Sequence, residues 1–87
     1  EENAFSAQKL SSLRSEQRMV FLNFTADWCI TCKVNEAIAL DKDKVRKILD
    51  EKNIIYLKAD WTRKDPEIAS MLASYGRTGV PLNLLFP

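Results

Sequence analysis

Apolar residues of this chain fall into three short runs that predict β-strands. The run over residues 19–25 is almost entirely apolar and β-prone, which is typical of a strand covered on both faces in the middle of a parallel sheet. A second run covers residues 54–59, and a third covers about 82–86, after turn-forming residues at 78–81. We therefore expect three strands, of which the first is central.

Between these runs, apolar residues recur at helical spacing. Ser6 is placed to cap a helix over about residues 7–17, with Leu10 and Leu13 on one side. The segment Asp65-Pro66-Glu67 combines a cap, a first-turn proline and an acidic residue, so it predicts a helix start, and Gly76 is placed to end that helix. The apolar stripe of this helix consists of Ile68, Met71, Leu72 and Tyr75.

A longer helical region begins at the cysteine pair, Cys29 and Cys32, and we expect it in two pieces. The pattern changes near Leu40, where Asp41 or Asp43 is placed to act as a fresh cap. The second piece shows the spacing i, i+3, i+4, i+7 at Val45, Ile48, Leu49 and Lys52. The predicted order is α-β-α-β-α-β, in which a strand, a crossover helix and a strand imply a right-handed parallel pair.

Composition excludes several kinds of chemistry. The 87 residues include no histidine, which rules out Ser-His and Cys-His catalytic pairs and His-ligated metals. A net charge of +1 gives no field that would attract nucleic acid or an anionic membrane. No apolar run reaches the roughly 18 residues of a membrane span. We expect a single soluble domain over 1–87, a fragment of a larger protein that does not itself insert into a membrane.

Both cysteines lie in the motif Trp28-Cys29-Ile30-Thr31-Cys32, at the predicted junction of a strand and a helix. There Cys29 would meet free backbone N–H groups and the positive end of the helix dipole, which lower the pKa of its thiol below the roughly 8.5 of a free cysteine. We therefore predict Cys29 as the attacking nucleophile. Cys32 follows one helical turn later on nearly the same face, and we predict that it resolves the mixed disulfide.

Two other interpretations of the pair are an accidental pair of buried cysteines and a half-site for a soft metal such as Cu(I). A copper-carrying loop would offer Met or His nearby, whereas this loop offers Asp27 and Trp28. The neighbouring residues therefore favour redox chemistry, and we expect no metal site.

Three motifs in the same order give the chain a resemblance to the thioredoxin superfamily. They are residues 23–33, which contain the cysteine pair, Asp60-Trp61-Thr62, and Gly79-Val80-Pro81. Around Ala26-Asp27-Trp28 and Asp60-Trp61, the chain most resembles the C-terminal soluble domains of the DsbD family of bacterial transmembrane thiol:disulfide interchange proteins.

The resemblance implies a thioredoxin-like α/β fold, with a mixed sheet flanked by helices. Such a sheet normally continues past its third strand with a hairpin partner and a closing helix, so this chain looks truncated before its last strand and helix. We expect residues 82–86 to leave an edge that residues outside this sequence, or another chain, would cover.

The resemblance also implies substrate-binding residues. Pro81 corresponds to the cis-proline of the family opposite the cysteine pair, and the backbone of Val80 would pair with an extended substrate segment, as a small β-augmentation. Base rates alone favour a trans bond, because only about 5–6% of X-Pro bonds are cis. Trp28 is expected to shield the disulfide and line the docking surface, with a core position as the alternative. Trp61 is expected either to form a wall of the same groove or to cover the sheet edge.

One position departs from the superfamily pattern. Many thioredoxins have a buried aspartate where this chain has Asn23, which cannot titrate. Glu36 lies four residues after Cys32 on the same helical face, and a glutamate there is a feature of the DsbD C-terminal domain. We expect Glu36 to take over the proton transfer, with a pKa raised by partial burial. The alternatives are a solvated Glu36 and an Asn23 that is only a satisfied polar residue; Lys33 is assigned no catalytic role.

The function that this resemblance implies is that of a thiol:disulfide oxidoreductase without a cofactor, acting as a reductant or relay. Its partners would be protein disulfide substrates and a membrane-embedded thiol donor in the parent protein, and its location would be the bacterial periplasm, as a soluble domain of an inner-membrane protein involved in cytochrome c biogenesis. Two rival functions are a soft-metal-binding module that uses both thiolates and a redox-silent thioredoxin-like binding domain.

The residues between the cysteines lead to the first prediction. No histidine separates them, which removes one means of stabilising a reduced thiolate, the device by which strong oxidants reach high potentials. We expect a reduction potential between roughly −200 and −270 mV, measured by equilibrating the domain with glutathione redox buffers. A value near about −120 mV would reverse the assignment as a reductant or relay.

Overall fold

The computed structural model describes residues 2–87 of the chain. Its elements in chain order are β1 (Glu2–Ala4), α1 (Ala7–Ser15), β2 (Val20–Thr25), α2 (Ile30–Asn35), the π-helical turn η1 (Glu36–Leu40), α3 (Asp43–Glu51), β3 (Ile55–Asp60), α4 (Pro66–Ser74) and β4 (Leu82–Phe86).

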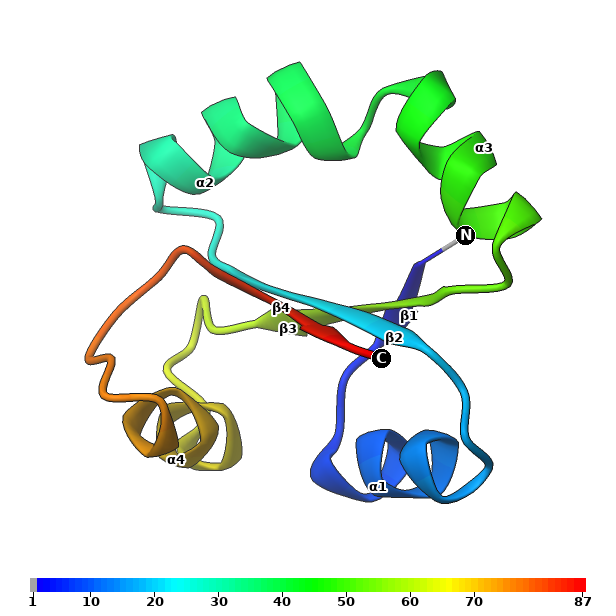
Figure 1. Ribbon diagram of the computed structural model, residues 1–87. Coiled ribbons are helices and arrows are strands. Elements are labelled where there is room, and N and C mark those ends of the chain that lie inside the picture. Colours follow the sequence, from blue (N-terminus) through cyan, green and yellow to red (C-terminus); the bar gives the residue numbers. More distant parts are fainter. Residues whose placement is uncertain (1) are drawn as a thin grey trace.

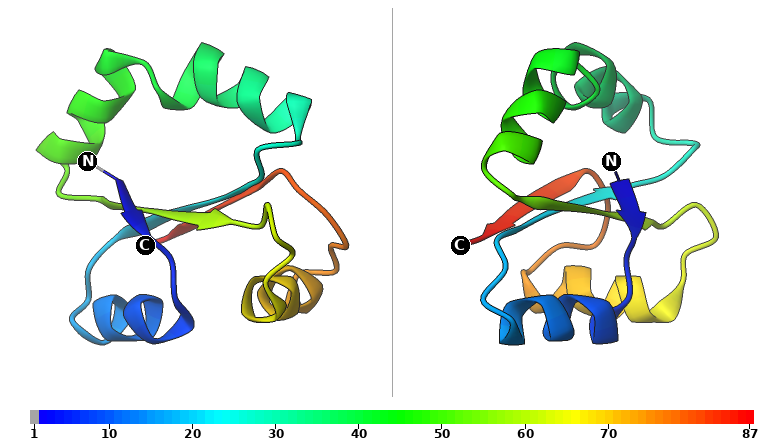
Figure 2. Two further views of the ribbon diagram at one scale, coloured as in Figure 1. Left: turned by 180° about the vertical axis from the view of Figure 1, so that it is seen from behind. Right: turned by 90° about the vertical axis from the view of Figure 1, so that its right-hand side faces the viewer.

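The described strands form a sheet in the order β1-β3-β2-β4. β2 pairs in parallel with β3 and antiparallel with β4, so Asn23 has Lys58 on one side and Asn83 on the other. Helices α2 and α3 lie on one face of the sheet, and α1 and α4 lie on the other (Figures 1 and 2). The predicted mixed sheet flanked by helices is therefore confirmed, with β2 in the interior and β4 at an edge.

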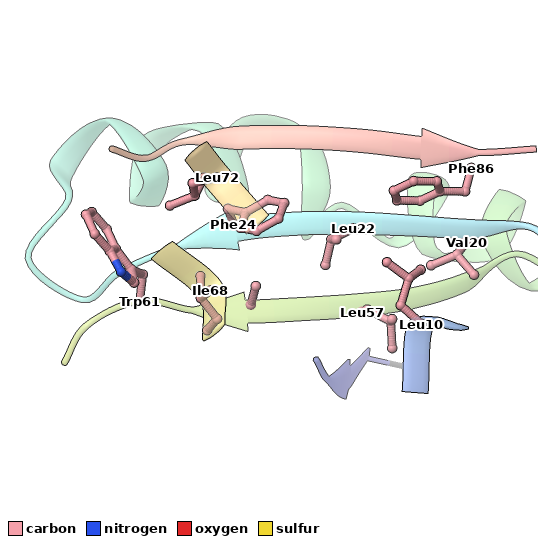
Figure 3. Packing of buried hydrophobic residues seen from close by; sticks show 10 residues of the cluster. Leu10, Val20, Leu22, Phe24, Leu57, Trp61, Ile68, Leu72 and Phe86 are labelled. Atoms are coloured by element: carbon pink, nitrogen blue, oxygen red, sulfur yellow. The ribbon is translucent and has the colours of Figure 1, made fainter. Parts of the chain in front are cut away.

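The main hydrophobic core fills the space between the sheet and the α1/α4 layer (Figure 3). Alternate residues of the two inner strands point into it, because side chains of a strand alternate between its faces. Its buried members are Leu10, Val20, Leu22, Phe24, Leu57, Ala59, Trp61, Ile68, Leu72 and Phe86. The intervening residues of β2 and β3 are directed to the α2 face, and these include the polar residues Asn23, Thr25 and Lys58.

Helix ends agree with the predictions to different degrees. The Ser6 hydroxyl accepts a hydrogen bond from the Lys9 backbone N–H at 3.0 Å, which confirms the cap of α1. This helix ends at Ser15 rather than near residue 17, because Gln17 takes a left-handed conformation with φ 60°. The Asp65 carboxylate caps α4 as predicted, whereas Tyr75 is exposed and does not belong to the buried stripe.

The predicted interruption near Leu40 is confirmed as the end of η1. The predicted cap at Asp41 or Asp43 is wrong. Lys42 occupies the cap position of α3 without a side-chain hydrogen bond, and the Asp41 carboxylate instead accepts a bond of 2.9 Å from Arg46. Asp43 lies in the first turn, where the helix dipole favours a negative charge.

The sequence pattern gave no sign of β1. Its three residues include Glu2 and Asn3 and have no apolar alternation. The strand forms because its backbone pairs in parallel with β3, with Asn3 opposite Leu57, and because the Phe5 N–H continues the ladder to the Lys58 carbonyl at 3.0 Å. Backbone pairing of this kind leaves no signal in the side chains.

The end of α4 leads to the second prediction, which uses the two glycines of the chain. Gly76 has φ +72° and donates its N–H to Ala73, while Arg77 donates to Leu72, as in a Schellman motif. Gly76→Ala should lower the free energy of unfolding by about 1 kcal/mol, because a Cβ is disfavoured in the left-handed region.

Gly79→Ala is the matched control, since Gly79 lacks that conformation and an added Cβ meets no atom within 4 Å. Urea unfolding should show it within about 0.5 kcal/mol of wild type. Equal losses for both variants would contradict the role of Gly76 as the helix stop.

Candidate active site

The cysteine pair lies where the central strand ends and α2 begins. Cys29 occupies the N-cap position of α2, with extended backbone angles φ −94° and ψ 101°, and its Sγ accepts a hydrogen bond of 3.1 Å from the Cys32 backbone N–H. The two cysteines form a disulfide with their Cα atoms 5.2 Å apart. Cys29 is 8% exposed and Cys32 is 1% exposed, so Cys29 is the more accessible cysteine.

The loop before β4 lies against this pair. The Val80–Pro81 peptide bond is cis, as the resemblance implied. The Val80 carbonyl oxygen lies 3.9 Å from Cys29 Sγ, and the half-buried Val80 side chain packs on the small cluster of Ala26, Cys29 and Cys32. The structure thus brings together residues separated by about half of the chain.

A second loop, which follows β3, is bonded to the loop of the cysteines. The Thr62 hydroxyl accepts a hydrogen bond of 2.8 Å from the Asp27 N–H and donates one to Asp60. The Trp28 indole N–H donates to the Thr62 carbonyl at 2.9 Å. Thr62 is therefore a brace between the end of β3 and the residues just before Cys29.

Two tryptophans meet beside this brace. Trp28 is 50% exposed, so the alternative of a core position is wrong. Trp61 is buried in the main core, and its ring centroid lies 6.0 Å from that of Trp28. Lys64 places its ammonium 5.4 Å from both ring centroids, within the range of a cation–π interaction. An aromatic surface with a cation thus adjoins the cysteine loop.

Glu36 follows Cys32 by one helical turn, and its backbone N–H bonds to the Cys32 carbonyl. It is 5% exposed, so the alternative of a solvated helix residue is wrong. Its Oε2 accepts a hydrogen bond of 3.1 Å from Asn23 Nδ2, and its Oε1 lies 3.5 Å from the Lys33 ammonium. The Lys33 ammonium also lies 3.6 Å from an Asp27 carboxylate oxygen and therefore links the buried carboxylate to the surface.

The predicted upward shift of the Glu36 pKa is wrong. Burial alone raises the pKa, but interactions with Thr25 and Asn23 and the positive charges of Lys58 and Lys33 outweigh it. The pKa of Glu36 therefore lies below its ordinary value of 4.5. The buried Thr25 hydroxyl makes no regular hydrogen bond. Because a hydroxyl can rotate, it still directs its hydrogen toward Glu36 and stabilises the charged form of that carboxylate.

Comparison with known proteins is consistent with this geometry. The model of the family described as thioredoxin-like matches residues 2–87. The chain belongs to the thioredoxin-like family. The thiol:disulfide interchange protein DsbD of Yersinia pestis is 34% identical over 73 residues, which cover 84% of this chain and 12% of that protein. DsbD of Neisseria meningitidis serogroup A is 37% identical over 62 residues, which cover 71% of this chain and 10% of that protein.

Solved structures of related domains have the same architecture. The oxidised C-terminal domain of DsbD from Neisseria meningitidis superposes with a TM-score of 0.70 at 28% identity, covering 95% of this chain and 76% of that one. A thioredoxin from Thermus thermophilus has a TM-score of 0.69 at 18% identity, covering 95% of this chain and 62% of that one, a likeness of fold alone. The resemblance to thioredoxins and to DsbD is thus confirmed, although this chain spans only about an eighth of the DsbD sequences.

Sequence reasoning missed two residues of this thioredoxin-like site. In the sequence, Thr62 is only the last residue of the motif Asp60-Trp61-Thr62. Its hydrogen bonds to Asp27 and Trp28 join two separate loops and exist only in the folded chain. For Tyr56 the sequence predicts only a place in a strand, whereas in the structure its hydroxyl accepts a hydrogen bond of 3.0 Å from Asn23 Nδ2. The signal available for Tyr56 was its position two residues before Lys58, which places both on the face opposite the core.

Neither a membrane span nor a larger metal-ligand cluster is found in the described part of the chain. Within residues 2–87, no helix combines the length and hydrophobicity needed to cross a bilayer. In the same range, no three or more His, Cys, Asp or Glu side chains come together as a metal site.

The lowered pKa of Glu36 leads to the third prediction. A carboxylate with a depressed pKa in the folded state contributes stability above its ordinary pKa of 4.5, and that stability is lost as the pH falls through the folded pKa. Glu36→Gln should therefore reduce the difference between the free energies of unfolding at pH 7 and pH 3, as measured by urea titration.

Glu51→Gln, which changes an exposed glutamate in α3, is the control and should retain the wild-type difference. An unaltered pH dependence in Glu36→Gln would show that the carboxylate is not stabilised as described.

Proposed function

We propose that this domain is a thiol:disulfide oxidoreductase that carries electrons through Cys29 and Cys32. The observation that carries the proposal is the place of Cys29 Sγ at the start of α2, where it accepts the Cys32 N–H at 3.1 Å. A donor at that position stabilises a thiolate, and the helix dipole acts in the same direction. Cys29 is the nucleophile because it is also the more exposed of the two cysteines.

The first step is an attack by the Cys29 thiolate on one sulfur of a substrate disulfide. A new bond joins Cys29 Sγ to that sulfur, the substrate S–S bond breaks, and the departing sulfur leaves as a thiolate that takes up a proton from water. The substrate remains joined to the domain by its other sulfur, as a mixed disulfide.

The second step releases the substrate. Cys32 loses its proton and attacks Cys29 Sγ, which forms the Cys29–Cys32 disulfide and expels the second substrate sulfur. Glu36, one turn after Cys32 and ionised at neutral pH because of its lowered pKa, is the proton acceptor. The substrate gains two electrons and the cysteine pair loses two. A dithiol donor then reduces the pair again.

Substrate docking is assigned to Trp28, Val80 and Pro81. The Val80 carbonyl oxygen lies 3.9 Å from Cys29 Sγ, the sulfur that reacts with the substrate. Backbone pairing there presents a partner sulfur without demanding a particular sequence. The half-exposed Trp28 ring supplies apolar contact area on the other side of the cysteine loop.

The relatives named thiol:disulfide interchange protein DsbD support a place for this domain in an electron relay. In this proposal a membrane-embedded cysteine pair of the parent protein reduces the domain in the bacterial periplasm. The domain then passes electrons to disulfides of partner proteins, including those that serve cytochrome c biogenesis. No further cofactor takes part.

The fourth prediction separates the roles of the two sulfurs. The reduced wild-type domain should accelerate reduction of insulin disulfides by dithiothreitol, and Cys29→Ser should fall to the rate of dithiothreitol alone. Cys32→Ser should instead accumulate a mixed disulfide between Cys29 and insulin, because its resolving thiol is absent. Mass spectrometry under non-reducing conditions identifies the adduct.

Cys29→Ser treated identically is the matched control and should give no adduct. An inactive wild-type domain, or a Cys29→Ser variant as active as wild type, would favour a redox-silent binding domain. Stoichiometric metal after purification from metal-supplemented medium, with no disulfide formed in air, would favour a soft-metal module instead.

A further inference from the structure

The Asn23 side-chain amide joins two buried groups that come from different elements. Its Nδ2 donates to Glu36 Oε2 at 3.1 Å and to Tyr56 Oη at 3.0 Å. An amide nitrogen carries two hydrogens, so both donors of Asn23 are used by these acceptors. All three residues are buried, which makes an unmatched donor or acceptor in this group costly.

Tyr56 is held in place by its own neighbours. Its ring meets Phe21 edge to face at a centroid distance of 5.4 Å and an angle of 87°. On the helical side, the Arg46 guanidinium lies 4.4 Å from the centre of the Tyr56 ring. Arg46 also donates from Nε to the Leu40 carbonyl at 3.0 Å, and Leu40 is the last residue of η1.

These contacts form a closed ring around η1. Glu36 begins this turn and Leu40 ends it, and between them the ring passes through Asn23 of β2, Tyr56 of β3 and Arg46 of α3. The turn itself is wide, because the Asp41 N–H bonds back to the Glu36 carbonyl at 2.7 Å across five residues. Irregular turns of this kind need support from their surroundings, and the ring ties both ends of η1 to the sheet.

We propose that Asn23 and Tyr56 are positioning residues that hold the Glu36 carboxylate beside Cys32 and so set the pH range in which Cys32 resolves mixed disulfides. This inference rests on the proposed function, because it gives Glu36 the role of accepting the Cys32 proton. In this role Tyr56 acts through Asn23, and Asn23 acts through Glu36.

Other groups face the same carboxylate and remain in place when Tyr56 is changed. Lys33 of α2 lies 3.5 Å from Oε1, and Lys58 of β3 adds a second positive charge. Thr25 of β2 adds a hydroxyl. In the proposed mechanism, Cys32 of α2 carries the proton to be moved. The Asp27 carboxylate shares Lys33 and weakens its effect. Removing the Tyr56 hydroxyl therefore alters the donor geometry of Asn23 without changing any of these charges.

The fifth prediction concerns Tyr56→Phe, which keeps the ring and its contacts but removes the acceptor of one Asn23 hydrogen. The amide is then free to turn away from Glu36, so the pKa of Glu36 should rise. Carbon-13 NMR of the Glu36 carboxyl in the oxidised domain should show a midpoint higher by about half to one pH unit, the equivalent of one hydrogen bond. The rate at which the insulin adduct is released falls at acidic pH, and the midpoint pH of that fall should rise by the same amount.

Tyr75→Phe is the matched control, because Tyr75 is the other tyrosine of the chain and is exposed. It should shift neither midpoint. In a Glu36→Gln background, Tyr56→Phe should leave the pH profile of adduct release unchanged, because the group through which it acts is absent. A purely structural role for Tyr56 would lower stability in both backgrounds and shift neither profile.

Asn23→Leu provides a second variant that removes both donors, and its Glu36 midpoint should rise further than that of Tyr56→Phe. Asn83→Leu, at the exposed position paired with Asn23 on β4, is its control. An active wild-type domain whose Glu36 midpoint is unmoved by Tyr56→Phe and Asn23→Leu would overturn this inference alone. A wild-type domain with no exchange activity would overturn the proposed function and this inference with it.

Discussion

The central strand β2 is buried on both faces, and this constraint positions the rest of the site. On one face, Leu22 and Phe24 pack in the main core. On the other face, Asn23 and Thr25 are buried polar residues, 2% and 1% exposed. The strand ends at the cysteine loop, so the same packing that makes β2 rigid also fixes where α2 begins. The position of Cys29 Sγ relative to the helix N–H groups follows from core packing rather than from the loop itself.

The buried carboxylate of Glu36 is stable because several elements supply partners to it. Desolvation disfavours the charge of Glu36, yet the Asn23 amide and the positive charges of Lys33 and Lys58 favour it more, and the pKa moves down. An aspartate in place of Asn23 would present acceptors instead of donors and add a like charge. The asparagine therefore leaves Glu36 as the single carboxylate of this group and favours its ionised form.

Local signals were sufficient to predict much of this architecture. Asp65-Pro66-Glu67 starts α4 through contacts within one turn, and the apolar runs predict that β2 is interior and parallel to β3. The strand β1, the width of η1 and the direction of the Glu36 pKa shift depend instead on residues far away in the chain. Cys29 and Cys32 are identifiable from the sequence because two cysteines separated by two residues are a known redox motif. Thr62, in contrast, acts through contacts that form only in the folded chain.

In the proposed mechanism, the ionised state of Glu36 gives the two cysteines different tasks. In the reduced domain a carboxylate near Cys32 opposes a second negative charge there, so Cys32 keeps its proton while Cys29 takes the stabilised thiolate position at the start of α2. Once Cys29 is bound in a mixed disulfide, its negative charge is gone, and in the proposed mechanism the Glu36 carboxylate then accepts the Cys32 proton. Under this proposal, the same group restrains Cys32 before a substrate is captured and activates it afterwards. A domain with only exposed carboxylates would lack this coupling, because water would screen their charge at both stages.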